Sequence, residues 1–379
     1  MRPETIVIVG SGPAGLATAS HLSQFGYVPN ILEQGNVPGA AWNKRPPDLK
    51  LATTRRLSSL PFYPMEPEFG RWPMARDWSA YLRRYAKRMG LLVKCNHEVH
   101  SVSSFENQWL VRTNREDFLC KVVVIATGED RVPLMPDIPG VETFQGILVH
   151  SSEFKQTKRG NLRVLVIGAG TSGCDVATLL AKQGHYVWLS VRRAPVILPR
   201  AIFGVSTSGL GSIANLVPTQ ILDGVGFAVQ AMAFGELPFE KKGRHRLSER
   251  RTIRYAPTID NGIAASIMGG LVHILPPTTR FVGEHVEFAG GLVVKPDLVI
   301  AATGYVPRLE QFIHHPNVLD GSGRPIHESK LKTCAPGLYF VALRPRVGPL
   351  LRECKLEAKK TAWHIDQYVT MHFKHKKNI

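Results

Sequence analysis

The sequence predicts an α/β protein with two dinucleotide-binding domains, the second inserted into the first. Three observations support this prediction. A glycine-rich turn follows an apolar run near the N-terminus, a second such turn follows another apolar run near the middle of the chain, and each is followed later by an apolar run that ends in Ala-Thr-Gly. A strand, a tight glycine turn and a helix in that order form the Rossmann-like fingerprint of dinucleotide binding. The 379 residues are enough for two such domains.

The first glycine turn occupies residues 10–15 and follows the apolar run at residues 5–9. Glycines there let the backbone approach a pyrophosphate at the N-terminus of the next helix. Glu33 stands where the second strand should end, and an acid at that place hydrogen-bonds a ribose hydroxyl. The alternative for Glu33 is a solvated surface acid. The predicted binding residues are Gly10, Gly12, Pro13, Ala14, Gly15, Glu33 and Gln34.

The second glycine turn occupies residues 168–173 and follows the apolar run at residues 164–167. The residues near the end of its second strand are basic, because Arg192 and Arg193 stand where the first unit has an acid. Arginine accommodates a 2′-phosphate, so the second dinucleotide is predicted to be NADPH. The predicted binding residues are Gly168, Gly170, Thr171, Ser172, Gly173, Arg192 and Arg193.

Other elements follow from periodicity. Residues 75–89 predict a basic amphipathic helix whose aromatic stripe of Trp78, Tyr81 and Tyr85 is best explained by core packing. Short strands are expected around residues 99–102 and 109–112. Residues 338–341 predict a last strand, and residues 353–367 predict a closing helix. The closing helix is expected to have one apolar face made of Ala358, Ala362 and Ile365.

An internal repeat indicates the domain order. Residues 122–126 lead into Thr127-Gly128, and residues 298–302 lead into Thr303-Gly304, so each glycine turn has its own later strand. A glycine at such a strand end lets the backbone pass close to a nucleotide. The expected domains are therefore a discontinuous first domain at residues 1–157 and 305–379, and an inserted second domain at residues 158–304.

Composition narrows the classes of protein. The five cysteines form no Cys-x-x-Cys pair, which argues against a dithiol redox centre. The histidines, among them His273, His314 and His315, show no metal-ligand pattern, so no metal is expected. The net charge of +17 favours the binding of anions such as NADPH. No nucleic-acid-binding motif accompanies this charge, so nucleic acid is not expected as a partner. Peripheral contact with a membrane stays open. The basic tail at residues 374–377 is expected to be solvated. With no apolar span and no room for a secretory signal, the expected location is cytoplasmic.

The segment between the two predicted domains carries the most specific motif. Residues 144–154 read Phe-Gln-Gly-Ile-Leu-Val-His-Ser-Ser-Glu-Phe, which resembles the Phe-x-Gly-x-x-x-His-x-x-x-Phe/Tyr signature of class B flavin-dependent monooxygenases. Together with both glycine turns and residues 302–305, it reproduces that family's motifs in order. Within the class, the chain is similar to YUCCA-type indole-3-pyruvate monooxygenases. The segments that carry this similarity are residues 126–129, 136–140, 196–200, 203–207 and 256–260.

The resemblance implies FAD in the first domain and NADPH in the second. It implies that reduced FAD captures O₂ as a flavin C4a-(hydro)peroxide, from which one oxygen atom enters a small organic substrate. Either a soft nitrogen or sulfur centre or an indole-type 2-oxo acid fits. The resemblance also implies further site residues, and it places His150 and Phe154 at a hinge beside the cofactors. The alternative for His150 is hydrogen bonding within the linker. The implied catalytic residues are His150, Phe154 and Lys50, and the added cofactor residues are Gly39, Trp42, Val99, Thr127, Gly128, Thr303 and Gly304.

Other functions stay open on the sequence. A Baeyer–Villiger monooxygenase is one, although that subfamily's linker usually ends in Trp followed by Pro or Asp, whereas this chain has Phe154-Lys155. A flavoprotein reductase or oxidase without oxygenation is another, weakened by the missing dithiol. The non-enzyme alternative is a flavin-binding regulatory protein. A monomer and a homodimer are both compatible with the sequence.

Overall fold

The computed structural model describes residues 6–154, 160–212, 217–239, 244–247, 257–326, 335–343 and 349–374. Lys155 and the side chains of the basic tail at residues 374–377 lie outside this part. The chain divides into two compact units. Unit 1 comprises Met1–Val132, Val306–Arg344 and Pro349–Ile379, and unit 2 comprises Pro133–Tyr305 and Pro345–Gly348. The chain passes from unit 1 to unit 2 within β8 (Val132–Pro133) and returns within β21 (Tyr305–Val306).

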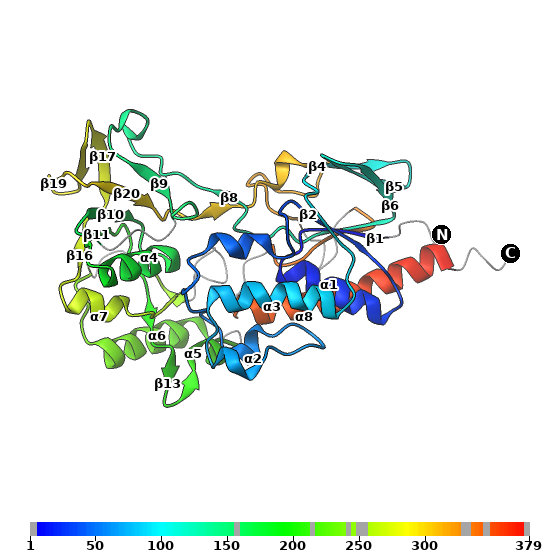
Figure 1. Cartoon of the computed structure of the whole chain (residues 1–379), viewed down its shortest axis with the longest axis horizontal. Helices are drawn as coiled ribbons and strands as arrows, with labels where there is room; N and C mark the ends of the chain where they lie inside the picture. Colours follow the sequence, from blue (N-terminus) through cyan, green and yellow to red (C-terminus); the bar gives the residue numbers. More distant parts are fainter. Residues whose placement is uncertain are drawn as a thin grey trace. The chain divides into compact units, whose positions relative to one another are not determined.

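Unit 1 is built on a five-stranded parallel sheet with the strand order β23-β7-β1-β2-β3. The helices α1, α3 and α8, which are labelled in Figure 1, share one hydrophobic core with one face of this sheet. The bounds are β1 Ile6–Val9, β2 Asn30–Glu33, β3 Val93–Cys95, β7 Val122–Ile125, β23 Leu338–Phe340, α1 Pro13–Gln24, α3 Ala75–Arg88 and α8 Leu350–Val369.

The opposite face of the parallel sheet packs against a second, four-stranded sheet of order β22-β4-β5-β6. Strand β1 shows the division: Ile6 and Ile8 belong to the core with the helices, whereas Val7 and Val9 belong to the core with the second sheet. This alternation follows from the two-residue period of a strand. The bounds are β4 Val99–Phe105, β5 Gln108–Thr113, β6 Asp117–Cys120 and β22 Ile313–His314.

The helices predicted for unit 1 are confirmed. Trp78, Tyr81 and Tyr85 of α3 are fully buried, so their stripe is core packing as expected. Two of them also donate hydrogen bonds to backbone carbonyls, because a buried hydroxyl needs a partner: Tyr81 Oη to Tyr63 at 2.5 Å and Tyr85 Oη to Pro61 at 2.8 Å. The closing helix α8 is longer than expected, and its predicted apolar face of Ala358, Ala362 and Ile365 is fully buried.

Unit 2 repeats this plan. Its five-stranded parallel sheet has the order β16-β11-β10-β20-β9. One face shares a core with α4 and α7, and the other shares a core with the three-stranded sheet β17-β18-β19. The bounds are β9 Leu148–His150, β10 Arg163–Ile167, β11 Tyr186–Ser190, β16 Val272–Leu275, β20 Leu298–Ala301, α4 Thr171–Lys182, α7 Ile263–Met268, β17 Thr278–Val282, β18 His285–Phe288 and β19 Val293–Val294.

The linker motif lies within unit 2. Strand β9 pairs in parallel with β20, with His150 opposite Ala301, so residues 133–157 belong by contact to this unit. The division by contacts therefore differs from the expected boundary at residue 158, because β9 forms an edge of the parallel sheet of unit 2. The sequence motif did not indicate this strand pairing.

The remaining elements are short, apart from α6. None of the helices in the described ranges combines the length and the apolar character that crossing a membrane requires. The bounds are η1 Ala40–Lys44, α2 Arg55–Ser58, η2 Pro67–Phe69, η3 Val141–Thr143, β12 Ile197–Leu198, β13 Ala201–Ile202, β14 Val205–Ser206, α5 Thr207–Leu210, α6 Thr219–Phe234, β15 Thr258–Ile259, η6 Leu309–Gln311, β22 as above and the π-helical end η7 Thr370–Lys374.

The close packing of α4 on its glycine turn generates a prediction. A Cβ at Gly173 would overlap the backbone carbonyl of Gly168, whereas a Cβ at Gly170 would meet no described atom within 4 Å. Gly173→Ala should therefore lower the free energy of unfolding by about 2–3 kcal/mol, since backbone must shift to admit the methyl group. Gly170→Ala is the matched control at the same helix end and should unfold like wild type in urea. Equal stability of both variants would contradict the prediction.

Candidate functional site

The first glycine turn leads into a helix end whose geometry suits an anion. Gly10 N–H donates to the carbonyl of Leu32 at 2.8 Å, which joins the turn to the end of β2. Gly12 is the N-cap of α1, and neither a side-chain cap nor an acid is present in the described first turn of that helix. A Cβ at Gly12 would meet nothing within 4 Å among the described atoms. The helix end therefore presents unpaired N–H groups and a partial positive charge to open space, as a pyrophosphate requires.

Glu33 is a buried acid, not a solvated one. Only 7% of its surface is exposed, and its carboxylate accepts three hydrogen bonds. Oε2 accepts from the Ser11 hydroxyl at 2.5 Å and from Ser11 N–H at 3.2 Å, and Oε1 accepts from Gly35 N–H at 2.9 Å. A carboxylate has about four acceptor positions, so one stays available for a ribose hydroxyl. The Ser11 hydroxyl in turn accepts from Gly39 N–H at 3.0 Å, which brings Ser11, Glu33 and Gly39 together.

The Ala-Thr-Gly end of β7 completes this site. Ala126 N–H donates to the carbonyl of Val9 at 2.9 Å, which places Thr127 beside the end of β1. The Thr127 hydroxyl oxygen is buried and has no hydrogen-bond partner in the described part of the chain. Gly128 has a φ of 76° and open space where a side chain would be. A buried polar atom without a partner beside an open backbone is what a cofactor site needs, so these residues fit a dinucleotide such as FAD.

The other residues expected on FAD, and Lys50, which was expected to be catalytic, lie in different surroundings. Trp42 is half-buried on η1 and packs edge-on against Trp78, with ring centroids 5.9 Å apart. Val99 is buried in the core between the two sheets of unit 1, and Gln34 is exposed. Lys50 is exposed and forms an isolated backbone bridge with Met74. The roles of these four residues stay predictions.

The second glycine turn has the same geometry. Gly168 N–H donates to the carbonyl of Ser190 at 3.1 Å, at the end of β11. Gly170 caps α4 without a side-chain hydrogen bond, and the helix has no acid in its described first turn. Thr171 and Ser172, the first two residues of the helix, are half-buried. This helix end therefore also fits an anionic phosphate.

The arginine pair lies slightly beyond the position predicted for it. The N–H of Gly10 donates to the carbonyl of Leu32, the residue before Glu33, and the N–H of Gly168 donates to the carbonyl of Ser190, the residue before Val191. Val191 is therefore the unit 2 position equivalent to Glu33. Arg192 and Arg193 come one and two residues after Val191, in the bend that follows β11. The sequence spacing from the glycine turn to the second strand does not show this offset, which depends on how β2 and β11 pair in their sheets.

Within this bend the two arginines differ in exposure. The Arg192 side chain is exposed, whereas Arg193 is half-buried and its Nη2 donates to the carbonyl of Arg244 at 3.5 Å. Both arginines lie just after the C-terminal end of β11, where a 2′-phosphate would be expected.

His150 is locked in a neutral form. Ser152 N–H donates to His150 Nδ1 at 3.1 Å, and the Ser152 hydroxyl lies 2.9 Å from the same nitrogen. Since Nδ1 accepts, the proton must be on Nε2, which donates to the carbonyl of Gly304 at 3.0 Å. Burial lowers the pKa of His150. The imidazole thus connects the linker to the Ala-Thr-Gly end of β20, with the Tyr305 ring edge-on at 4.9 Å.

The aromatic ends of the linker motif are packing residues in this structure. Phe154 is buried in the core that α4 shares with the parallel sheet, and Phe144 packs against Phe281 on the opposite face, 4.9 Å between centroids. A Cβ at Gly146 would collide with the Phe144 ring. The two phenylalanines of the motif therefore pack on opposite faces of the unit 2 sheet. This packing favours a structural role for Phe154. The catalytic role that the resemblance implies for Phe154 stays a prediction.

Thr303 differs from its counterpart Thr127. Its hydroxyl donates to the carbonyl of Leu134 in the linker, and Leu134 N–H donates to the carbonyl of Gly304 at 3.0 Å. The second Ala-Thr-Gly end is therefore tied to the linker, although Gly304 keeps open space where a side chain would be. Sequence reasoning missed Ser11 and Ser152, which hold Glu33 and His150. Their only signal was their place inside the two motifs.

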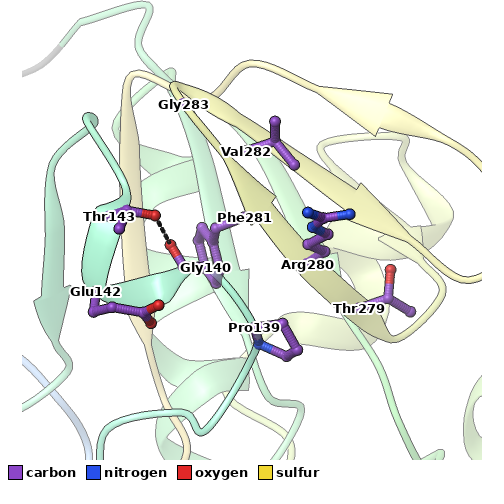
Figure 2. A pocket seen from close by; sticks show the side chains of 9 residues that line it. All are labelled: Pro139, Gly140, Glu142, Thr143, Thr279, Arg280, Phe281, Val282 and Gly283. Atoms are coloured by element: carbon purple, nitrogen blue, oxygen red, sulfur yellow. Dashed lines mark hydrogen bonds between the residues drawn. The ribbon is translucent and has the colours of Figure 1, made fainter.

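A groove of about 640 Å³ lies elsewhere on unit 2, between the residues around η3 and strand β17. Figure 2 shows Arg280 and Glu142 on its two sides and the hydrogen bond from the Thr143 hydroxyl to Gly140. None of the residues predicted to bind a cofactor lines it. We therefore locate the candidate site at the glycine turns and not in this groove.

Comparison with known proteins agrees with this geometry. Residues 7–200 match the family model described as pyridine nucleotide-disulphide oxidoreductase. A probable indole-3-pyruvate monooxygenase of Arabidopsis thaliana, YUCCA9, is 31% identical over 84% of this chain and 79% of its own length.

Solved structures share the fold. A flavin monooxygenase variant from Stenotrophomonas maltophilia superimposes with a TM-score of 0.78 at 22% identity, over 97% of this chain and 99% of that one. A bacillithiol disulfide reductase from Staphylococcus aureus reaches a TM-score of 0.72 at 18% identity, over 98% of this chain and 100% of that one. The fold is thus common to oxygenases and reductases and does not by itself distinguish them. Motifs, fold and sequence identity together show that the chain belongs to the class B flavin-dependent monooxygenases, enzymes that use FAD and NADPH, and that it is similar to their YUCCA type.

Proposed function

We propose that this enzyme uses NADPH and O₂ to convert a 2-oxo acid of the indole-pyruvate type into the carboxylic acid with one carbon fewer. The observation that carries the substrate class is the identity of about 30% to proteins named indole-3-pyruvate monooxygenases, over most of both chains. The balanced reaction consumes the 2-oxo acid, O₂, NADPH and a proton, and yields the acid, CO₂, NADP⁺ and water. Its proposed location is cytoplasmic, where the free thiols found in the described residues stay reduced.

The proposed binding roles follow from the two glycine turns. In unit 1, the α1 N-terminus takes the FAD pyrophosphate, Glu33 takes a ribose hydroxyl, and the Thr127 hydroxyl and the Gly128 backbone line the cofactor. In unit 2, the α4 N-terminus takes the NADPH pyrophosphate, and Arg192 and Arg193 take the 2′-phosphate. When bound, FAD would supply the redox and oxygen chemistry, with NADPH as the reductant. The protein's contribution is orientation and the exclusion of water.

His150 is proposed as a positioning residue. Its neutral imidazole keeps the linker at the Gly304 carbonyl, next to the backbone that would face NADPH. A group whose two nitrogens are both engaged is poorly suited to transfer a proton, so we favour this role over acid–base catalysis.

An isotope experiment tests the proposed function. The FAD-loaded enzyme is supplied with NADPH, ¹⁸O₂ and indole-3-pyruvate, and the products are analysed by mass spectrometry. We expect one ¹⁸O atom in the carboxylic acid, with NADPH consumed in equal amount. An ester product would indicate Baeyer–Villiger oxygenation. Labelled hydrogen peroxide without labelled product would indicate an oxidase. Parallel reactions contain a tertiary amine or a thioether in place of indole-3-pyruvate, and labelling of these compounds alone would reassign the substrate class.

The arginine pair should select NADPH over NADH. A charge-assisted hydrogen bond to the 2′-phosphate contributes about 1.5–3 kcal/mol, so Arg192→Ala and Arg193→Ala should together raise the KM for NADPH about 10- to 100-fold. The KM for NADH should change little, because NADH lacks the phosphate. Arg280→Ala removes an exposed arginine from the groove in Figure 2 and is the matched control. Equal losses for both coenzymes would refute the assignment.

The neutral state of His150 should make stability depend on pH. Its pKa in the folded protein is lowered from 6.5, so the stabilisation is complete above pH 6.5 and is lost as the pH falls from 6.5 toward the folded pKa. Urea unfolding between about pH 8 and about pH 5 should show wild type losing more stability than His150→Gln, by less than about 1.4 kcal/mol per pH unit. His21, whose pKa burial also lowers, contributes equally to both proteins. Parallel pH profiles would show that His150 does not titrate in this way.

A further inference from the structure

The residues that follow β23 lie at the cofactor end of unit 1. Strand β23 runs parallel to β7, with Phe340 opposite Ile125, and Val341 N–H donates to the carbonyl of Ile125 at 3.0 Å. Val341 therefore comes next to Ala126, the first residue of the Ala-Thr-Gly end. Ligands of open parallel sheets bind at the carboxyl ends of the strands. The backbone after β23 thus borders the same sheet edge as the first glycine turn and the Thr127 hydroxyl.

This backbone adopts a left-handed conformation at Ala342. The φ of Ala342 is 64°, a region that residues other than glycine rarely enter because Cβ crowds the backbone. Ala342 and its neighbours Val341 and Leu343 are buried. A residue keeps a conformation of this kind only where its surroundings hold it, and such residues cluster at functional sites. The structure must therefore contain a contact that holds Ala342.

A buried acid of α8 makes such a contact. Glu357 Oε2 accepts from Ala342 N–H at 2.7 Å, and only 5% of the Glu357 surface is exposed. Its neighbours on the buried face of the helix include Cys354 and Ala358, which belong to the apolar core of unit 1. Burying a carboxylate is costly unless it is hydrogen-bonded. Packing alone would select an apolar residue at position 357, so the acid indicates a need for an acceptor at this backbone N–H.

We propose that Glu357 is a positioning residue of the unit 1 cofactor site. Its carboxylate holds Ala342 in the left-handed conformation, and this fixes the backbone of residues 341–343 beside the Ala-Thr-Gly end before FAD binds. A site whose backbone is already in place holds its ligand more tightly, because less ordering is needed on binding. The inference rests on the binding roles proposed above for unit 1 and is independent of the substrate.

The rate of FAD release tests this role. The full-length, FAD-loaded protein is diluted, and release is followed by the rise in flavin fluorescence. Glu357→Met removes the acceptor and keeps a side chain of similar size, so it should speed release about tenfold or more. Glu357→Gln keeps an oxygen that can accept from Ala342 N–H, and its release rate should stay within about threefold of wild type. Both replacements are good helix formers, so α8 should persist, which thermal melting would verify.

A second substitution separates positioning from a general loss of stability. Glycine adopts the left-handed conformation without strain, so Ala342→Gly added to Glu357→Met should slow FAD release again by about threefold or more. A role of Glu357 in core stability alone would not be rescued in this way, because the replaced side chain stays the same.

Two single variants serve as controls. Thr361→Val changes the buried face of α8 one helical turn from Glu357, at a hydroxyl without a hydrogen-bond partner in the described part of the chain, and should release FAD like wild type. Gly12→Ala puts a methyl group into the open space at the α1 N-terminus and should speed FAD release with Glu357 intact.

Three results would overturn the proposal. Equal release by wild type and Glu357→Met, with faster release by Gly12→Ala, would exclude Glu357 and leave the FAD site in place. Equally fast release by Glu357→Met with alanine or glycine at position 342 would show that Glu357 does not act through that residue. Unchanged release by Gly12→Ala would contradict the binding roles proposed for unit 1, and the inference would fall with them.

Discussion

The rest of the structure depends on the close contact between each of the helices α1 and α4 and the glycine turn that precedes it. At Gly15 and Gly173 the helix backbone lies so close to the carbonyls of Gly10 and Gly168 that no side chain fits. This contact aims the free N–H groups of α1 and α4 past the open positions Gly12 and Gly170. Binding geometry is thereby set by backbone packing, which is stiffer than any arrangement of flexible side chains.

Both units use one construction, and they differ in what surrounds it. Unit 1 places the buried, hydrogen-bonded Glu33 beside its turn and leaves the Thr127 hydroxyl without a partner in the described residues. Unit 2 places arginines beyond its strand and ties the Thr303 hydroxyl to the linker. An acid suits an uncharged ribose and arginines suit a phosphate, so the electrostatics around a common backbone differ between the two units.

The linker motif acquires a physical explanation from the structure. Its phenylalanines fill the cores on opposite faces of one sheet, its glycine makes room for a ring, and its histidine connects β9 to the end of β20. Sequence reasoning identified this histidine and left its role open between catalysis and hydrogen bonding within the linker. The hydrogen bonds to both ring nitrogens favour the second interpretation.

Local sequence alone determined the glycine turns, the buried stripe of α3, the buried face of α8 and both Ala-Thr-Gly ends, because each depends on residue spacing within one element. Tertiary structure decided the rest. Ser11 reaches Glu33 across 22 residues, and His150 reaches Gly304 across 154. The strand register made Val191, not Arg192, the unit 2 equivalent of Glu33. Hydrogen bonds between residues distant in sequence depend on how strands pair and where the chain returns, which no single segment encodes.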